Sequence, residues 1–156
     1  MAWSASKMFR QFLADIAGNT TALDLDSGSF KAALYNNTIT PDQNVSAANS
    51  AYNVGQWASA QECSESGQWA AGGVALAGLS LNVGTAGVVF WDANDVVSGS
   101  AADLTNATGC LVYENVVATP VANQGVCYNY FGGPNSVVNG TFTIIWNVLG
   151  IWRATL

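Results

Sequence analysis

The first twenty residues carry hydrophobic side chains at spacings of three and four, which is the pattern of an amphipathic helix. This stripe consists of Met8, Phe9, Phe12, Leu13 and Ile16. Polar residues, among them Lys7 and Arg10, fill the opposite side. We expect Ser4 or Ser6 to cap the helix and the Gly18-Asn19 pair to end it.

From about residue 20 the hydrophobic period changes from 3.6 to 2, which indicates strands. Residues 29–35 form the first expected strand, and residues 36–51 form a long polar loop or a loop with a short helical turn. Six further runs read as strands: 74–81, 86–92, 110–117, 124–131, 141–148 and 151–156. Turn residues separate them, including Gly-Gly-Pro-Asn at 132–135.

Short strands at this spacing predict a mainly β fold: an antiparallel β-sandwich or jelly-roll-like single domain with one amino-terminal α-helix. The chain of 156 residues is long enough for one hydrophobic core. We expect a helical segment over 1–19 and an antiparallel β domain over 20–156. Gly-Gln-Trp-Ala occurs at 55–58 and again at 67–70. This echo fits two adjacent strands of a meander, and we interpret it as two similar turns, each with an exposed or half-buried tryptophan.

Composition excludes several functions. Ten Asp and Glu stand against four Lys and Arg, so the chain cannot assemble the clustered cations that nucleic acid requires. Without any histidine there is no Ser-His-Asp triad and no imidazole metal site. No apolar run is long enough to span a membrane. We therefore expect no enzyme activity, no catalytic residue, no metal and no cofactor.

The remaining candidates for chemistry are better explained by structural roles. The Asp92-Asn94-Asp95 cluster lacks the glycine and glutamate of a calcium-binding EF-hand loop and reads as a turn. The glutamates Glu62, Glu65 and Glu114 could supply a glycosidase pair only if the fold joined two of them. Three cysteines cannot pair completely. We interpret them as buried free thiols, with one bond between Cys110 and Cys127 as the alternative.

Aromatic residues are abundant on a chain with so little charge. Alternate residues of a strand point to the same face, and one such set in the predicted strands is expected in the core: Phe30, Phe142, Ile144, Trp146 and Val148. In contrast, Trp3, Trp57, Trp69 and Trp91 lie near turns or ends, and we expect about half of them to face a partner or a loop. A surface that is polar but mostly uncharged favours association.

The amino-terminal segment, residues 1–18, has two possible roles. It can anchor the chain to a neighbouring protein, because Lys7 and Arg10 place positive charge at one end of an acidic chain and Trp3 precedes the helix. Alternatively, it covers its own sandwich as a lid. The candidate partner-binding residues are Trp3, Lys7, Met8, Phe9, Arg10, Phe12, Trp57 and Trp69.

Several runs together resemble small virion structural proteins of tailed bacteriophages. They are FKAALYNNTITPD, AYNVGQW, GQWAAGGVALAGLSL, GCLVYENVVATPVANQGVCYNYFGG and the closing GTFTIIWNVLGIWRATL. The resemblance covers about residues 30–156 and rests on strand patterns. It implies a non-enzymatic, β-rich virion component.

Within that class the resemblance favours a capsid decoration (cement) protein that binds the outer surface of the major capsid protein shell and stabilises it. The chain would be made in the bacterial host cytoplasm and end in the virion. A homo-oligomer is expected, with a trimer favoured, and neither nucleic acid nor membrane is a partner. Two alternatives remain: a tail or head–tail component, and a carbohydrate-binding β module of a fibre in which Trp57 and Trp69 stack on sugars.

Overall fold

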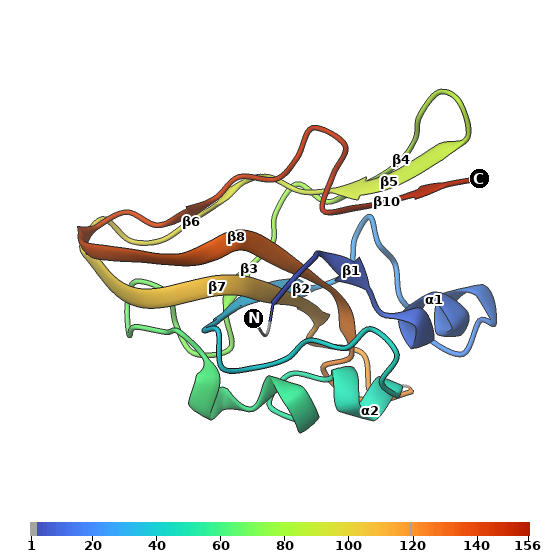
Figure 1. The fold of residues 1–156 in the computed structure, drawn as a ribbon. Helices are drawn as coiled ribbons and strands as arrows, with labels where there is room; N and C mark the ends of the chain where they lie inside the picture. Colours follow the sequence, from blue (N-terminus) through green and yellow to red (C-terminus); the bar gives the residue numbers. More distant parts are fainter. Residues whose placement is uncertain (1–2, 119) are drawn as a thin grey trace.

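A five-stranded antiparallel sheet lies at the centre of the molecule (Figure 1). The computed structural model describes residues 3–118 and 120–156. They form a mainly β, single sandwich-like domain with antiparallel sheets and a short amino-terminal helix, so the predicted fold class is confirmed. The elements are β1 (Lys7–Met8), α1 (Arg10–Ala17), β2 (Phe30–Tyr35), α2 (Ala47–Ser50), η1 (Gly55–Trp57), η2 (Ser59–Gln61), β3 (Val74–Ala75), β4 (Ser80–Val83), β5 (Val88–Asp92), β6 (Val96–Val97), β7 (Ala102–Glu114), β8 (Gly125–Gly140), β9 (Thr143–Ile144) and β10 (Trp152–Thr155).

The large sheet has the strand order β1-β8-β7-β2-β3. Its β2 strand pairs with β7 along its whole length, from Phe30 opposite Glu114 to Tyr35 opposite Gly109. β7 and β8 form a long hairpin with several register shifts. The predicted turn at 132–135 is wrong, because these residues continue β8. β1 pairs with β8 only at Tyr128 and Cys127, so Pro134 lies where β8 has no second neighbour and no backbone N–H is needed there.

One face of this sheet is covered by two smaller sheets, β10-β5-β4 and β6-β9 (Figure 1). Trp91 of β5 packs edge-on against Phe30 of β2 with ring centroids 4.8 Å apart. The predicted strand 74–81 is divided between the layers, since Gly78 takes a positive φ of 65° between β3 and β4. Predicted strand 141–148 shrinks to two residues, and Val148 is 88% exposed rather than buried in the core.

The other face of the large sheet is covered by residues 36–73, which include α2, η1 and η2 (Figure 1). The expected short helical turn within 36–51 is α2. The two Gly-Gln-Trp-Ala segments are not adjacent strands of a meander. Gly55 and Gly67 both have positive φ, which suits turns, and the first tryptophan lies in η1 whereas the second closes a bridge with Glu65.

The amino-terminal segment is part of the sheet as well as of a helix. Residues 7–8 pair with β8, so α1 begins at Arg10 and has no side-chain cap. The predicted cap at Ser4 or Ser6 is therefore wrong, and the Ser6 hydroxyl accepts a hydrogen bond from the Tyr130 N–H at 3.0 Å. Gly18 ends the helix as predicted, with its N–H bonded to the Ala14 carbonyl.

Candidate functional site

A cleft opens where the two layers of the sandwich fail to close. It lies between β1, an edge strand of the large sheet, and β10, an edge strand of the small sheet. Two adjoining hollows of about 410 and 540 Å³ share several wall residues. We call their union the edge cleft. Its walls are Ser6, Lys7, Met8, Cys127, Asn129, Tyr130, Phe131, Asn135, Phe142, Thr143, Ile144, Ile145, Trp146, Asn147, Leu149, Gly150, Ile151, Trp152 and Arg153.

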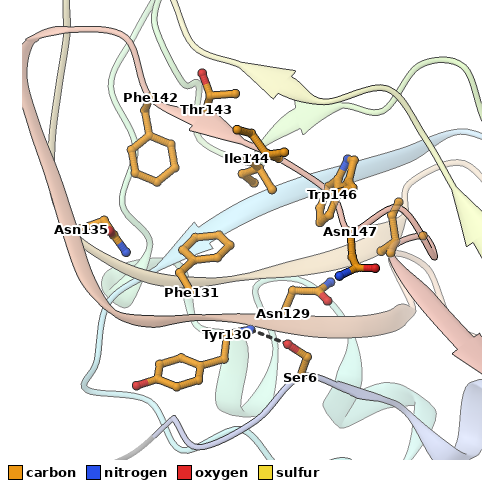
Figure 2. A pocket seen from close by; sticks show the side chains of 13 residues that line it. Ser6, Asn129, Tyr130, Phe131, Asn135, Phe142, Thr143, Ile144, Trp146 and Asn147 are labelled. Atoms are coloured by element: carbon orange, nitrogen blue, oxygen red, sulfur yellow. Dashed lines mark hydrogen bonds between the residues drawn. The ribbon is translucent and has the colours of Figure 1, made fainter.

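The walls of the edge cleft combine amides with apolar surface. Strand alternation places Cys127, Asn129 and Phe131 of β8 on one face of the large sheet. Figure 2 shows Asn129 and Phe131 rising from β8 toward the segment that carries Ile144 and Asn147. Such a surface can pack against apolar side chains and can both donate and accept hydrogen bonds through its amides.

The charge of the edge cleft differs from that of the whole protein. The chain has a net charge of −6, with ten acidic residues. None of these acidic residues lines the cleft, whereas two of the four cations, Lys7 and Arg153, do. Both side chains are exposed. The cleft therefore carries positive charge on a protein that is acidic overall.

A tight loop forms one rim of the cleft. Asn147 holds it together: its carbonyl accepts from the Gly150 N–H at 2.7 Å and its side-chain oxygen accepts from the Leu149 N–H at 2.9 Å. Gly150 has a φ of 86°, and a Cβ there would lie 2.3 Å from the Trp91 carbonyl oxygen, so only glycine fits. The loop leaves Ile145 and Val148 strongly exposed beside the cleft.

Of the predicted partner-binding residues, the structure brings two to this cleft. Lys7 and Met8 line it from β1. Arg10 begins α1, is exposed, and donates to the Asn44 side-chain oxygen at 2.8 Å. A partner role for these three residues stays a prediction.

The other predicted contact residues are buried. Trp3, Phe9, Phe12, Trp57 and Trp69 are each at most 1% exposed, so the expected exposure of the tryptophans is wrong. For Trp3, Phe9 and Trp57 the physical reason is that residues 3–18 and residues 36–73 form a layer of their own over the large sheet, whereas Trp69 is buried against Phe142 next to β9. Without the aromatic side chains of that layer, the second face of β2 and β7 would meet water.

The ring contacts show which layer each tryptophan belongs to. Trp57 packs against Tyr35 at 5.1 Å and against Trp3 at 5.8 Å, on the face covered by residues 36–73. Trp69 packs against Phe142 at 5.8 Å. Trp91 is fully buried too and donates its indole N–H to the Leu25 carbonyl at 2.7 Å. None of the four can stack on a ligand in this conformation.

Trp3, Phe9 and the helix residue Phe12 cover the core of their own domain. The Trp3 indole N–H donates to the Asn36 carbonyl at 2.9 Å, and its ring stacks on Tyr130 at 6.4 Å. Phe9 and Phe12 are completely buried, while Leu13 is half exposed. The side chains of Trp3, Phe9 and Phe12 are occupied by contacts within the domain, which supports the lid alternative, and an anchoring role for them stays a prediction.

Glu62 is a partly buried carboxylate in a tyrosine network. It accepts hydrogen bonds from the Tyr52 hydroxyl at 2.7 Å and from the Gly72 N–H at 2.8 Å. Tyr52 stacks on Tyr113, whose hydroxyl donates to the Gly72 carbonyl at 2.6 Å. Burial raises the pKa of Glu62 above its ordinary value, and burial followed by the Glu62 hydrogen bond raises the pKa of Tyr52 to about 12. This network joins residues 52–73 to the sheet.

The other candidate carboxylates also have structural partners. Glu65 accepts from the Asp103 N–H, and Glu114 accepts from the N–H groups of Val116 and Val117. Asp95 accepts from the Trp146 N–H at 3.0 Å, which agrees with a structural turn. Within residues 3–118 and 120–156 no group of three or more His, Cys, Asp or Glu side chains could hold a metal ion. In the same part of the chain, no helix has both the length and the apolar character needed to cross a membrane.

The three cysteines are free and buried, as we interpreted them. Cys110 lies opposite Asn129 and Cys127 lies opposite Val112, so the two cysteines occupy neighbouring strands without forming the alternative bond. Burial raises the pKa of all three thiols, to about 11 for Cys63 and about 12 for Cys127. Such thiols are poor nucleophiles at neutral pH.

Sequence reasoning missed most of the edge cleft. Asn129, Asn147 and Arg153 were not singled out, because the strand pattern does not say which strands become edges. The usable signal was Arg153, an isolated cation in the last strand run of an acidic chain. Comparisons with protein-family models, curated proteins and solved structures gave no match. The function must therefore be argued from the site itself.

Proposed function

We propose that this chain is a non-enzymatic bacteriophage virion structural protein, a capsid decoration protein that binds the outer surface of the major capsid protein shell through its edge cleft. The observation that carries the proposal is the composition of that cleft. It holds Lys7 and Arg153 and none of the ten acidic residues. The resemblance of residues 30–156 to phage virion proteins supplies the class of partner.

The charge distribution supports a defined docking side. An acidic domain is repelled by an acidic partner over most of its surface, and this repulsion is weakest where its cations lie. Complementary charge orients an encounter and selects against wrong partners more than it adds affinity. A decoration protein must meet the shell in one orientation, and the edge cleft gives this domain one preferred side.

The rim of the cleft supports a protein partner. Ile145 and Val148 are 76% and 88% exposed, and Leu149 beside them is 39% exposed. A cluster of exposed apolar side chains next to polar groups is typical of protein interfaces. Association that buries this rim would remove apolar surface from water, which supplies affinity that the two cations alone do not.

Self-association belongs to the same proposal. A small decoration protein gains contact area on the shell when several copies share a symmetry axis, and a trimer places three edge clefts on one particle. The trimer is a prediction for light scattering in solution and on particles.

The test is binding of the purified protein to shell particles assembled without it. The double variant Lys7→Gln/Arg153→Gln removes both cleft cations and should bind at least about tenfold more weakly, with a reduced dependence on salt. The matched control is Thr85→Glu/Ser100→Glu, which changes net charge by the same amount at two exposed positions outside the cleft. The control should bind as the wild type does. Equal binding of wild type and the cleft variant would contradict the proposal.

A carbohydrate-binding module is the second candidate. Stacking of Trp57 and Trp69 on sugar rings no longer supports this candidate, because both side chains are buried. The edge cleft offers a different one: half-buried Trp146 beside Asn129 and Asn147 gives an aromatic ring next to planar amides, a combination that suits sugar rings. A polysaccharide pull-down that succeeds with the wild type and fails with Trp146→Ala would favour this candidate.

A further inference from the structure

β10 is an edge strand, and one side of its backbone has no neighbouring strand to bond to. Residue pairing in β5–β10 runs from Trp152 opposite Trp91 to Thr155 opposite Val88, and the Leu156 N–H donates to the Gly87 carbonyl at 2.9 Å. In an antiparallel pair, alternate residues make the ladder hydrogen bonds. Residues 152, 154 and 156 therefore bond to β5, and the N–H and C=O groups of Arg153 and Thr155 point away from it.

The opposite edge of the same sheet is β4, and its outward N–H groups differ from those of β10 in their hydrogen bonding. In β4 the corresponding outward groups are the N–H groups of Leu81 and Val83, because Gly84 donates to the Val88 carbonyl and so fixes the alternation. The Asp26 carboxylate accepts the hydrogen bond of Leu81. Within the described residues no such acceptor meets the outward N–H groups of Arg153 and Thr155. The β4 edge is therefore capped at Leu81 by this chain's own side chain, whereas neither outward N–H group of β10 has such a cap among the described residues.

The open edge borders the edge cleft. Trp152 and Arg153 of β10 line it on one side, and Lys7 and Met8 of β1 line it on the other. β1 contributes a second free edge. Phe9 donates to the Val126 carbonyl at 3.0 Å, so residues 7 and 9 bond to β8 and the Met8 backbone points outward. Among the strands of residues 3–118 and 120–156, none closes the sandwich on this side.

We infer that an extended, carboxylate-bearing segment of the shell partner adds to β10 as an extra antiparallel or parallel strand, with its acidic side chains meeting Lys7 and Arg153. This inference rests on the proposed function for the identity of the partner. The backbone groups of Arg153 and Thr155 give the segment its hydrogen bonds, and alternate side chains face the apolar walls of the edge cleft. Strand addition of this kind draws affinity from main-chain bonds and specificity from side-chain pockets.

Charge decides between the possible occupants. A second copy of this chain would bring a further net charge of −6, and every strand in its described residues is already paired within one of its own sheets. A partner segment rich in Asp or Glu complements the two cations and meets no acidic residue in the cleft. A basic segment is repelled by both cations.

The first test uses a peptide on the intact protein, so that it does not depend on the shell. The probe is acetyl-Val-Glu-Val-Glu-Val-Glu-Val-amide, with two controls: the same peptide with every Glu replaced by Lys, and the Glu peptide with alternate backbone nitrogens methylated. Amide NMR spectra should show the Glu peptide shifting and protecting the Arg153 and Thr155 N–H groups, while both controls bind at least about tenfold more weakly. Failure of the Glu peptide to bind, or equal binding of the methylated peptide, would overturn the inference.

The second test uses particles and separates this inference from the proposed function. Thr155→Pro removes one outward N–H and no ladder bond, and Thr155→Val is the matched control that keeps the N–H. Both variants are first checked for an unchanged thermal midpoint, and the methylated peptide carries the test if Thr155→Pro is unstable. Strand addition predicts that only Thr155→Pro loses particle binding.

Each outcome has one meaning. If the wild type does not bind particles but binds the Glu peptide at β10, the proposed function is contradicted and strand addition at β10 is supported. If particles bind Thr155→Pro as well as Thr155→Val, strand addition is overturned and the decoration role stands. If Thr155→Pro instead turns a wild-type oligomer into a monomer, a second copy occupies the edge and the inference of an acidic partner is overturned.

Discussion

The Asp26 carboxylate accepts a hydrogen bond from the outward-facing backbone N–H of Leu81, and it thereby caps the outer edge of β4 at this residue. Asp26 belongs to a turn that Asp24 stabilises by accepting from the Ser27 hydroxyl at 2.6 Å and from the Asp26 N–H at 2.9 Å. Edge strands with free N–H groups are templates for association, and a carboxylate on the edge prevents it.

Removal of this acceptor should open the second edge. Asp26→Ala should lower the free energy of unfolding by about 1 kcal/mol and increase self-association above that of the wild type. Asp26→Asn loses the same charge but keeps a side-chain oxygen for Leu81, so it should behave like the wild type. Urea unfolding and light scattering measure the two effects. Equal association of the two variants would mean that charge, and not the capped edge, keeps the copies apart.

The buried tryptophans should matter for stability. Trp57→Ala removes the ring at the centre of one aromatic layer and should cost about 3–5 kcal/mol in the free energy of unfolding. Trp146→Ala, at the half-buried rim of the edge cleft, should cost clearly less. Urea denaturation of both variants checks this. A Trp57→Ala protein that is as stable as the wild type but no longer binds its partner would contradict the core role of Trp57 and indicate a binding role.

Glu62 should make stability depend on pH. Because burial raises its pKa, the folded protein holds the Glu62 proton more tightly than the unfolded chain does. Its contribution to stability is therefore complete below the ordinary pKa of 4.5 and is lost as the pH rises through the folded-state pKa. Glu62→Gln should flatten this part of the curve when unfolding is measured from pH 4 to pH 8. Parallel curves for wild type and variant would contradict the burial of the charge.

The cysteines should be unreactive until the protein unfolds. Burial raises the pKa of Cys63, Cys110 and Cys127, so few thiolates exist near neutral pH and little of each sulfur is accessible. A thiol reagent at pH 8 should label none of them in the folded protein and all three in urea. Labelling of only one cysteine in urea would show that Cys110 and Cys127 are bonded.

The sequence predicted local elements better than their arrangement. Alternation identified β2, β5 and β10, but only the carboxy-terminal end of β7 and the amino-terminal half of β8. It could not predict that residues 36–73 form a third layer, which decides that Trp57 is buried. The Gly132-Gly133 pair reads locally as a turn, yet it lies within β8 because tertiary pairing with β7 extends through bulges.

The candidate site was predicted only in part. Lys7 and Met8 were named because charge and apolar character coincide near the amino terminus, and both line the edge cleft. Asn129 and Arg153 lie more than twenty residues apart in the sequence, on strands of different sheets, and only the sandwich brings them together. Which edges stay open depends on which strand ends the sheet, and hydrophobic periodicity carries no such information.

The most direct test of the account is an image reconstruction of shell particles decorated with this protein, at a resolution that places its strands. We predict that the shell contacts the domain along the edge cleft, with shell density lying against β10 beside Lys7 and Arg153. Shell contact through another part of the domain, with the edge cleft facing solvent, would contradict this prediction.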